Sequence, residues 1–122
     1  MNLKKRLESF GFAFKGIATL IQTQHNAQIH VFAVFFVSIL GFLLKISTIE
    51  WCFIIFAFAI VLAAEAFNTA IEFVVDLVSP NYHPLAGKAK DVAAAAVLLT
   101  AVGASIVGMI IFVPKLWAFI QK

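Results

Sequence analysis

The chain has 122 residues, of which 63% are hydrophobic and 12% are charged, and its mean hydropathy is +1.04. This length allows one domain, residues 1–122, and the composition is that of a membrane protein. The net charge of +3 is too small to indicate a nucleic-acid partner, and a single cysteine excludes an internal disulfide.

The first segment, about residues 3–23, has the pattern of an amphipathic helix. Its apolar positions recur at steps of three and four: Leu3, Leu7, Phe10, Phe14, Ile17 and Ile21. Lysines and other polar residues occupy the opposite face, so we predict a helix that lies on the membrane surface with its lysines near anionic headgroups. The alternative, a soluble core helix, would need a soluble part of the chain to cover it. A secretory signal is not expected, because "KKR" is not followed by a small-residue cleavage site.

Three later segments are long and apolar enough to cross a bilayer, which needs about 20 helical residues. They cover about 29–46, 51–76 and 91–113, and Pro114 and Lys115 close the third. Ala104, Gly108 and the alanines at 93–96 would let another helix approach closely, within or between chains. The alternative is a loosely packed span that is merely rich in small residues.

The basic residues predict the orientation. With the N-terminus in the cytoplasm, three spans place Lys4, Lys5, Arg6, Lys15, Lys88 and Lys90 inside, and Lys45, Lys115 and Lys122 outside. The connection between the second and third spans is therefore expected on the cytoplasmic side.

The second span ends in "EAFNTAIEFVVD", residues 65–76. On a helix, Glu65, Glu72 and Asp76 share one face, with Asn68 beside them. Counted from Trp51, Glu65 lies about 21 Å and Glu72 about 31 Å along the helix axis. Since the hydrocarbon core is about 30 Å thick, Glu65 is expected just inside its cytoplasmic boundary and Glu72 at that boundary.

Carboxylates at that depth need a partner, a cation or a proton. Lys88, Lys90 and Asp91 open the third span on the same side, and Asp91 is placed to cap that helix or to fix a lysine. One alternative is an ion-pair cluster that only locks the two helices together. The other is phosphoryl transfer between a lipid alcohol and a nucleotide, in which a shallow carboxylate takes a proton and another holds Mg²⁺.

The chain contains no Gly-rich Lys/Ser phosphate loop and no protein-kinase signature. Instead, "EAFNTAIEFVVD", "KAKDVAAAAVLL" (88–99) and "FKG" (14–16) resemble the small prokaryotic diacylglycerol kinase and undecaprenol kinase family. The resemblance covers nearly the whole chain. It implies an all-α enzyme of the bacterial cytoplasmic membrane, with a surface helix, three transmembrane helices, a homotrimeric assembly and active sites shared between subunits. ATP, Mg²⁺ and a lipid alcohol are the implied ligands.

The resemblance also implies roles for individual residues. Glu65 matches the general base on the lipid hydroxyl, and Glu72 matches a metal ligand. The positions that match the nucleotide site are Lys5, Asn68, Asp76, Asn81, Tyr82, His83, Lys90 and Asp91. Without the resemblance, His83 would be read as a solvated loop histidine.

Two positions depart from the family pattern. Gln24 stands where a second metal-binding glutamate is common, and a glutamine carbonyl can ligate Mg²⁺ but brings no charge. Phe12 stands where some members carry a tyrosine. His25 and His30, close to Gln24, are interpreted as interfacial anchors or hydrogen-bond donors rather than Mg²⁺ ligands, because Mg²⁺ prefers oxygen.

The substrate is the least determined feature. The segments "HPLAGKAKD", "IEW" and "IIFVPKL" look more like those of undecaprenol kinases, which favours undecaprenol over diacylglycerol. A different class remains open as an alternative, a small oligomeric transporter that couples Glu65 to protons. A transporter has no use for the cluster at 88–91.

Overall fold

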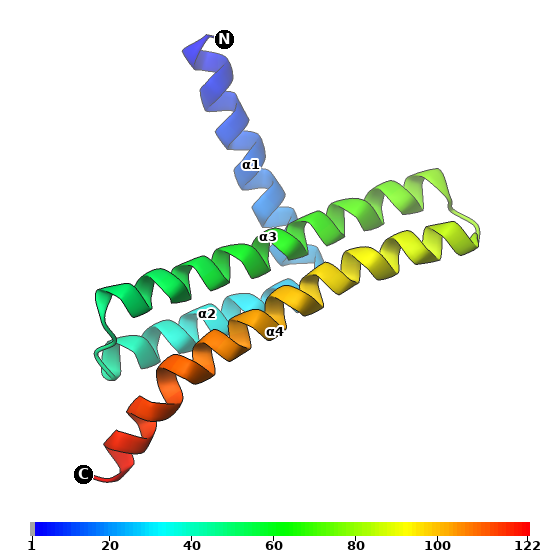
Figure 1. Ribbon diagram of the computed structural model, residues 1–122. Coiled ribbons are helices and arrows are strands. Elements are labelled where there is room, and N and C mark those ends of the chain that lie inside the picture. Colours follow the sequence, from blue (N-terminus) through cyan, green and yellow to red (C-terminus); the bar gives the residue numbers. More distant parts are fainter. Residues whose placement is uncertain (1) are drawn as a thin grey trace.

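The computed structural model describes residues 2–122, and Figure 1 shows that all of its regular structure is helical. The helices are α1 (Leu3–Thr23), α2 (His25–Leu43), α3 (Thr48–Val78) and α4 (Pro84–Ile120). Helices α2, α3 and α4 are long and apolar enough to cross a membrane. This confirms the prediction of an all-helical chain with three candidate membrane spans.

The helices are arranged as a hairpin with two additions. Helices α3 and α4 run antiparallel and make the most extensive packing in the chain, while α2 packs against α3. Helix α1 contacts α2 and α3 only through its C-terminal part, and its N-terminal half projects away from the hairpin (Figure 1). The short break between α1 and α2 is at Gln24, whose backbone is extended.

The connection from α2 to α3 is tightly specified. Lys45 adopts a positive φ of 51°. Its N–H donates to the carbonyl of Phe42, and the N–H of Ile46 donates to the carbonyl of Gly41. These two bonds form the Schellman pattern that ends many helices. Ser47 and Glu50 then form a capping box that starts α3.

The main apolar cluster lies at this end of the hairpin. Ile46, Ile54, Ile111 and Phe112 are buried together there. An ion pair between Lys115 Nζ and Glu50 Oε2, at 3.3 Å, ties α4 to the first turn of α3. The other end of the hairpin, at the α3–α4 loop, lies outside this apolar cluster and carries polar residues instead.

Helix α4 extends beyond the predicted third span at both ends. Pro114 does not end the helix, which continues to Ile120. Proline is tolerated inside membrane helices because other groups satisfy the carbonyl that it leaves free. Asp91 does not cap the helix either, because α4 already begins at Pro84 with His83 as its N-cap, so Asp91 lies inside α4.

Candidate active site

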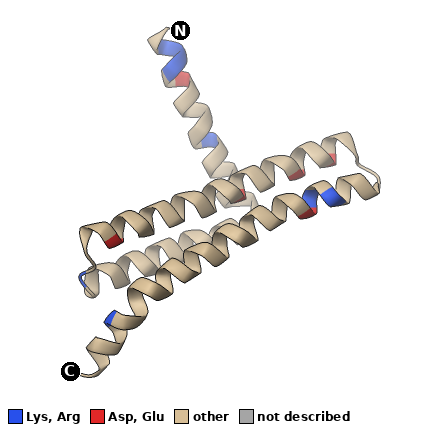
Figure 2. Ribbon diagram, in the orientation of Figure 1, with Lys and Arg blue, Asp and Glu red and all other residues tan. Residues whose placement is uncertain are grey.

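A row of polar residues follows one face of α3 toward the α3–α4 loop. Its members recur at helical spacing: Glu65, Asn68, Thr69, Glu72 and Asp76. Figure 2 shows the acidic positions of α3 along this half of the hairpin, beside the charged cluster of α4. Exposure rises along the row. The side chain of Glu65 is 2% exposed, and that of Asp76 is 63% exposed. The row therefore joins the interior of the helix bundle to its surface.

Glu65 is the most enclosed charged group of the row. Its nearest basic partner is His30 of α2, with 3.4 Å between His30 Nε2 and Glu65 Oε1. Oε1 is enclosed and makes no hydrogen bond. A buried carboxylate in this condition is an unusual and costly arrangement, which is typical of a site that binds or reacts.

Glu72 lies two turns further along and is half-buried. Asn68 Nδ2 donates a hydrogen bond of 3.3 Å to Glu72 Oε1. The other end of the Asn68 amide, Oδ1, is enclosed without a hydrogen bond. Asn68 thus orients Glu72 and keeps a free acceptor in the row.

The row reaches α4 at Asp76. Lys90 Nζ donates to Asp76 Oδ1, which links α3 to α4 close to the loop that joins them. Asp91 and Lys88 are exposed on α4. The structure therefore brings Lys90 directly to the row and leaves Lys88 and Asp91 free at the surface.

The loop residues predicted near the nucleotide lie beside this ion pair. A shallow pocket of about 260 Å³ is lined in part by Asp76, Lys90, Asn81, Tyr82 and His83. Tyr82 is 91% exposed. His83 Nδ1 accepts a hydrogen bond from the N–H of Leu85 at 3.1 Å, so the ring has a structural function as a helix cap.

Within residues 2–122, no hydrogen bond or ion pair joins the row to the predicted site residues on and after α1, which are Lys5, Phe12 and Gln24. Lys5 lies in the N-terminal half of α1, which Figure 1 shows projecting away from the hairpin. Phe12 is exposed, with Lys15 Nζ 5.6 Å from the centre of its ring. Gln24 is half-buried at the α1–α2 break, and its Nε2 donates to Thr23 Oγ1 at 3.2 Å.

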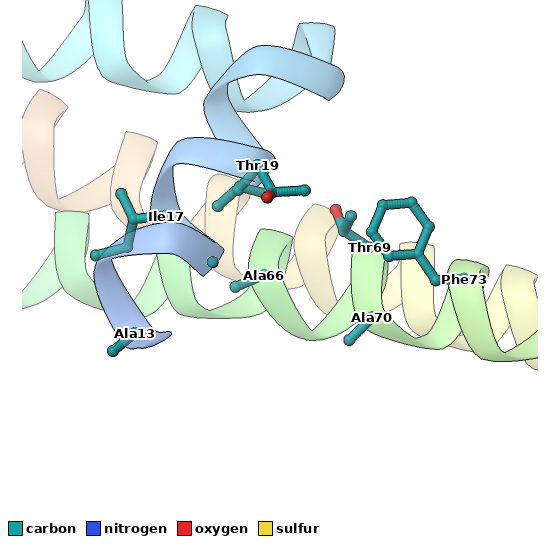
Figure 3. A pocket seen from close by; sticks show the side chains of 9 residues that line it. Ala13, Ile17, Thr19, Ala66, Thr69, Ala70 and Phe73 are labelled. Atoms are coloured by element: carbon teal, nitrogen blue, oxygen red, sulfur yellow. The ribbon is translucent and has the colours of Figure 1, made fainter. Parts of the chain in front are cut away.

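An apolar pocket of about 360 Å³ lies next to the row, between α1 and α3 (Figure 3). Helix α1 contributes Ala13, Ile17 and Thr19, and α3 contributes Thr69 and Phe73, together with other small residues. Thr69 is 4% exposed, and its hydroxyl oxygen makes no hydrogen bond. An apolar chain with one polar end is the kind of molecule that such a pocket can hold.

The donor set fits a hard cation such as Mg²⁺ in chemistry, since Glu72 offers carboxylate oxygens and Gln24 an amide oxygen. Across residues 2–122, no three His, Cys, Asp or Glu side chains converge on one point. Glu72 is already oriented by Asn68, which suits it for a ligand role. One chain thus supplies individual oxygen ligands, and phosphate oxygens or waters would complete the coordination.

Two members of the site were not predicted from the sequence, Thr69 and His30. Thr69 lies one turn after Glu65 on the same face of α3, so helical spacing could have identified it. His30 was interpreted as an interfacial anchor or hydrogen-bond donor, with no partner named. Only the packing of α2 on α3 shows that it faces Glu65.

Comparison with known proteins gives consistent matches. The family model for prokaryotic diacylglycerol kinase matches residues 11–112. The chain is 44% identical to an undecaprenol kinase of Bacillus subtilis over 114 residues, 93% of each protein. It is 41% identical to a diacylglycerol kinase of Synechocystis over 111 residues, 90% of this chain and 63% of the relative. A diacylglycerol kinase of Escherichia coli K12 is 30% identical over 112 residues, 92% of this chain and 88% of the relative.

Proposed function

The chain belongs to the prokaryotic diacylglycerol kinase family of membrane lipid kinases, and from this we propose that it transfers the γ-phosphoryl group of ATP to the hydroxyl of a long-chain lipid alcohol. The observation that carries the proposal is the polar row of α3. It begins at a carboxylate enclosed between helices and ends at an exposed carboxylate paired with Lys90. A lipid hydroxyl and a nucleotide phosphate can meet only along such a path, because one is dissolved in oil and the other in water.

In the proposed reaction, Glu65 takes the proton of the lipid hydroxyl. The lipid oxygen forms a bond to the γ-phosphorus, the bond from this phosphorus to the β–γ bridging oxygen breaks, and ADP leaves with that electron pair. Lys90 stabilises negative charge on the phosphates. Asn68, Asp76, Asp91 and the loop at 81–83 line the nucleotide side.

Glu72 and Gln24 are the residues that would hold Mg²⁺. The bound ion would neutralise charge on the phosphates of the nucleotide. Because Gln24 replaces a charged ligand by a neutral one, this chain is expected to need more Mg²⁺ than a relative with glutamate there.

Assembly and orientation are part of the proposal. We take residues 1–122 as one domain, with the surface helix at about 3–23 and the membrane crossings at about 29–46, 51–76 and 91–113. The N-terminus would lie in the cytoplasm, at the bacterial inner membrane. A homotrimer would let Lys5 and Phe12 on α1 of one subunit approach the row of a neighbour, because the N-terminal half of α1 projects away from the hairpin of its own chain.

Undecaprenol is the favoured substrate. The sequence segments noted above and the 44% identity to an undecaprenol kinase support this choice, while relatives named as diacylglycerol kinases are 41% and 30% identical. The family assignment gives no support to the alternative of a proton-coupled transporter.

Purified protein in detergent micelles, assayed with radiolabelled ATP and Mg²⁺, should label undecaprenol faster than diacylglycerol at equal mole fraction. The labelled product should partition into the organic phase. A higher rate on diacylglycerol would overturn the substrate choice, and no labelled lipid from either alcohol would overturn the proposed function.

A further inference from the structure

We propose that His30 is a positioning residue for Glu65, donating a hydrogen bond from Nε2–H to Oε1 and so holding the carboxylate in the orientation that proton transfer requires. This inference rests on the proposed function, because it assumes that Glu65 is the general base. It concerns a residue that neither the acidic motif of α3 nor the basic cluster of α4 contains.

The first support is geometric. His30 lies on α2 and Glu65 on α3, and the two side chains face each other with 3.4 Å between Nε2 and Oε1. Within residues 2–122, no other basic side chain lies within 4 Å of either Glu65 oxygen. The two atoms are within ion-pair distance, although they form no hydrogen bond as they stand.

The second support is energetic. Glu65 is 1% exposed and its Oε1 makes no hydrogen bond. An enclosed carboxylate oxygen without a donor destabilises the protein, so a donor this close is favoured to bind it. Catalytic hydrogen bonds are often long in a ligand-free enzyme and shorten when substrate binds.

The third support comes from the surroundings of His30. Its side chain is only 23% exposed and lines an apolar groove of about 200 Å³ with Ala33, Ala104 and Gly108 among its other walls. An interfacial anchor would instead present its ring to the headgroups. With its ring between this groove and Glu65, His30 is placed to act on the acid rather than on the membrane surface.

The His30 donor would fix the orientation of the Glu65 carboxylate for the reaction. A carboxylate held at one oxygen by a fixed donor presents the other oxygen in a defined direction. A misplacement of about 1 Å at a reacting group can lower a rate about 10²-fold. Loss of the His30 donor should therefore lower kcat and leave the binding of the lipid nearly unchanged.

The test compares two neutral amides at this position. In His30→Gln the amide nitrogen can reach the place of Nε2, whereas in His30→Asn the side chain is too short. We expect His30→Asn to lower kcat about 10- to 100-fold, with the KM for the lipid within about twofold of wild type, and His30→Gln to retain kcat within about threefold. His25→Asn is the matched control, because His25 is an exposed histidine on the same helix, and it should behave as wild type.

All variants would first be compared by gel filtration and circular dichroism in the same detergent. Equal kcat in the Asn and Gln variants, whether at the wild-type level or equally reduced, would overturn the positioning role. A rise in the KM for the lipid without a change in kcat would also overturn it. These outcomes are distinct from failure of the proposed function, in which the wild-type protein itself labels no lipid.

Discussion

Replacing Glu65 by glutamine is expected to lower kcat by about 10²- to 10⁴-fold, the usual contribution of a general base. Glutamine has nearly the same shape as glutamate and cannot accept the proton of the lipid hydroxyl. The affinity for Mg·ATP should change little, since Glu65 is enclosed between α2 and α3 and lies far along the row from the exposed loop. Rates would be measured with radiolabelled ATP, and nucleotide affinity by equilibrium binding to the same preparation.

Glu8→Gln provides the control for this variant. Glu8 is an exposed acid on α1, and its replacement makes the same change of charge away from the row. It should leave kcat within about twofold of wild type. If Glu65→Gln retains more than a tenth of wild-type kcat, Glu65 is not the base, and its burial serves the packing of α2 and α3 instead.

Replacing Glu72 by glutamine should instead act through the metal. The Asn68 contact and the side-chain volume can be kept, but the charge that attracts Mg²⁺ is lost. We expect the Mg²⁺ concentration for half-maximal rate to rise about tenfold or more, together with the KM for ATP. A titration of initial rate against free Mg²⁺ at saturating lipid would measure both changes.

Gln24→Glu is the opposite change and should lower the Mg²⁺ requirement. It adds charge at the α1–α2 break, where we propose the second metal ligand. If Gln24→Glu leaves the Mg²⁺ requirement unchanged or raises it, Gln24 does not approach the metal.

The effects of Glu72→Gln and Glu65→Gln should differ from each other. If the two variants give the same pattern of effects on kcat, nucleotide affinity and Mg²⁺ requirement, the two acids do not have the separate roles proposed.

Much of the fold could be predicted from the sequence because apolar length is a strong signal. The long apolar runs indicated three spans, and the structure has helices there that extend further at most ends. Helix ends were predicted less well. The start of α4 could have been predicted, because proline at the first helical position, here Pro84 after His83, is typical of a helix N-terminus. The prediction of about residue 91 followed the charges at 88–91 instead.

Pro114 lies inside α4, beyond the end of the predicted span. In a soluble protein, a proline after a long helical run commonly marks the end of the helix. In α4 the helix passes through it, and Lys115 reaches back to Glu50 of α3. This ion pair joins residues that are far apart in the sequence, so no local sequence pattern could predict it.

The same distinction between local patterns and contacts distant in sequence applies to the site. The row on α3 follows from helical periodicity within one segment, so Glu65, Asn68, Glu72 and Asp76 could be placed on one face in advance. The partner of Glu65 could not, because His30 belongs to another helix and its orientation depends on how α2 packs. Lys90 was expected near the row from topology alone, and the structure shows which acid it meets.

The central claim is that the row on α3 crosses from hydrocarbon into water between Glu65 and Asp76. It can be tested by spin labels attached to single cysteines introduced at exposed positions of α3, after Cys52 has been replaced by serine. Phe56, Phe67, Phe73 and Leu77 are suitable sites. We expect labels at 56 and 67 to be reached mainly by oxygen and a label at 77 mainly by a water-soluble nickel chelate, with the change near 73. Dominant oxygen accessibility at 77, or dominant nickel accessibility at 56, would contradict it.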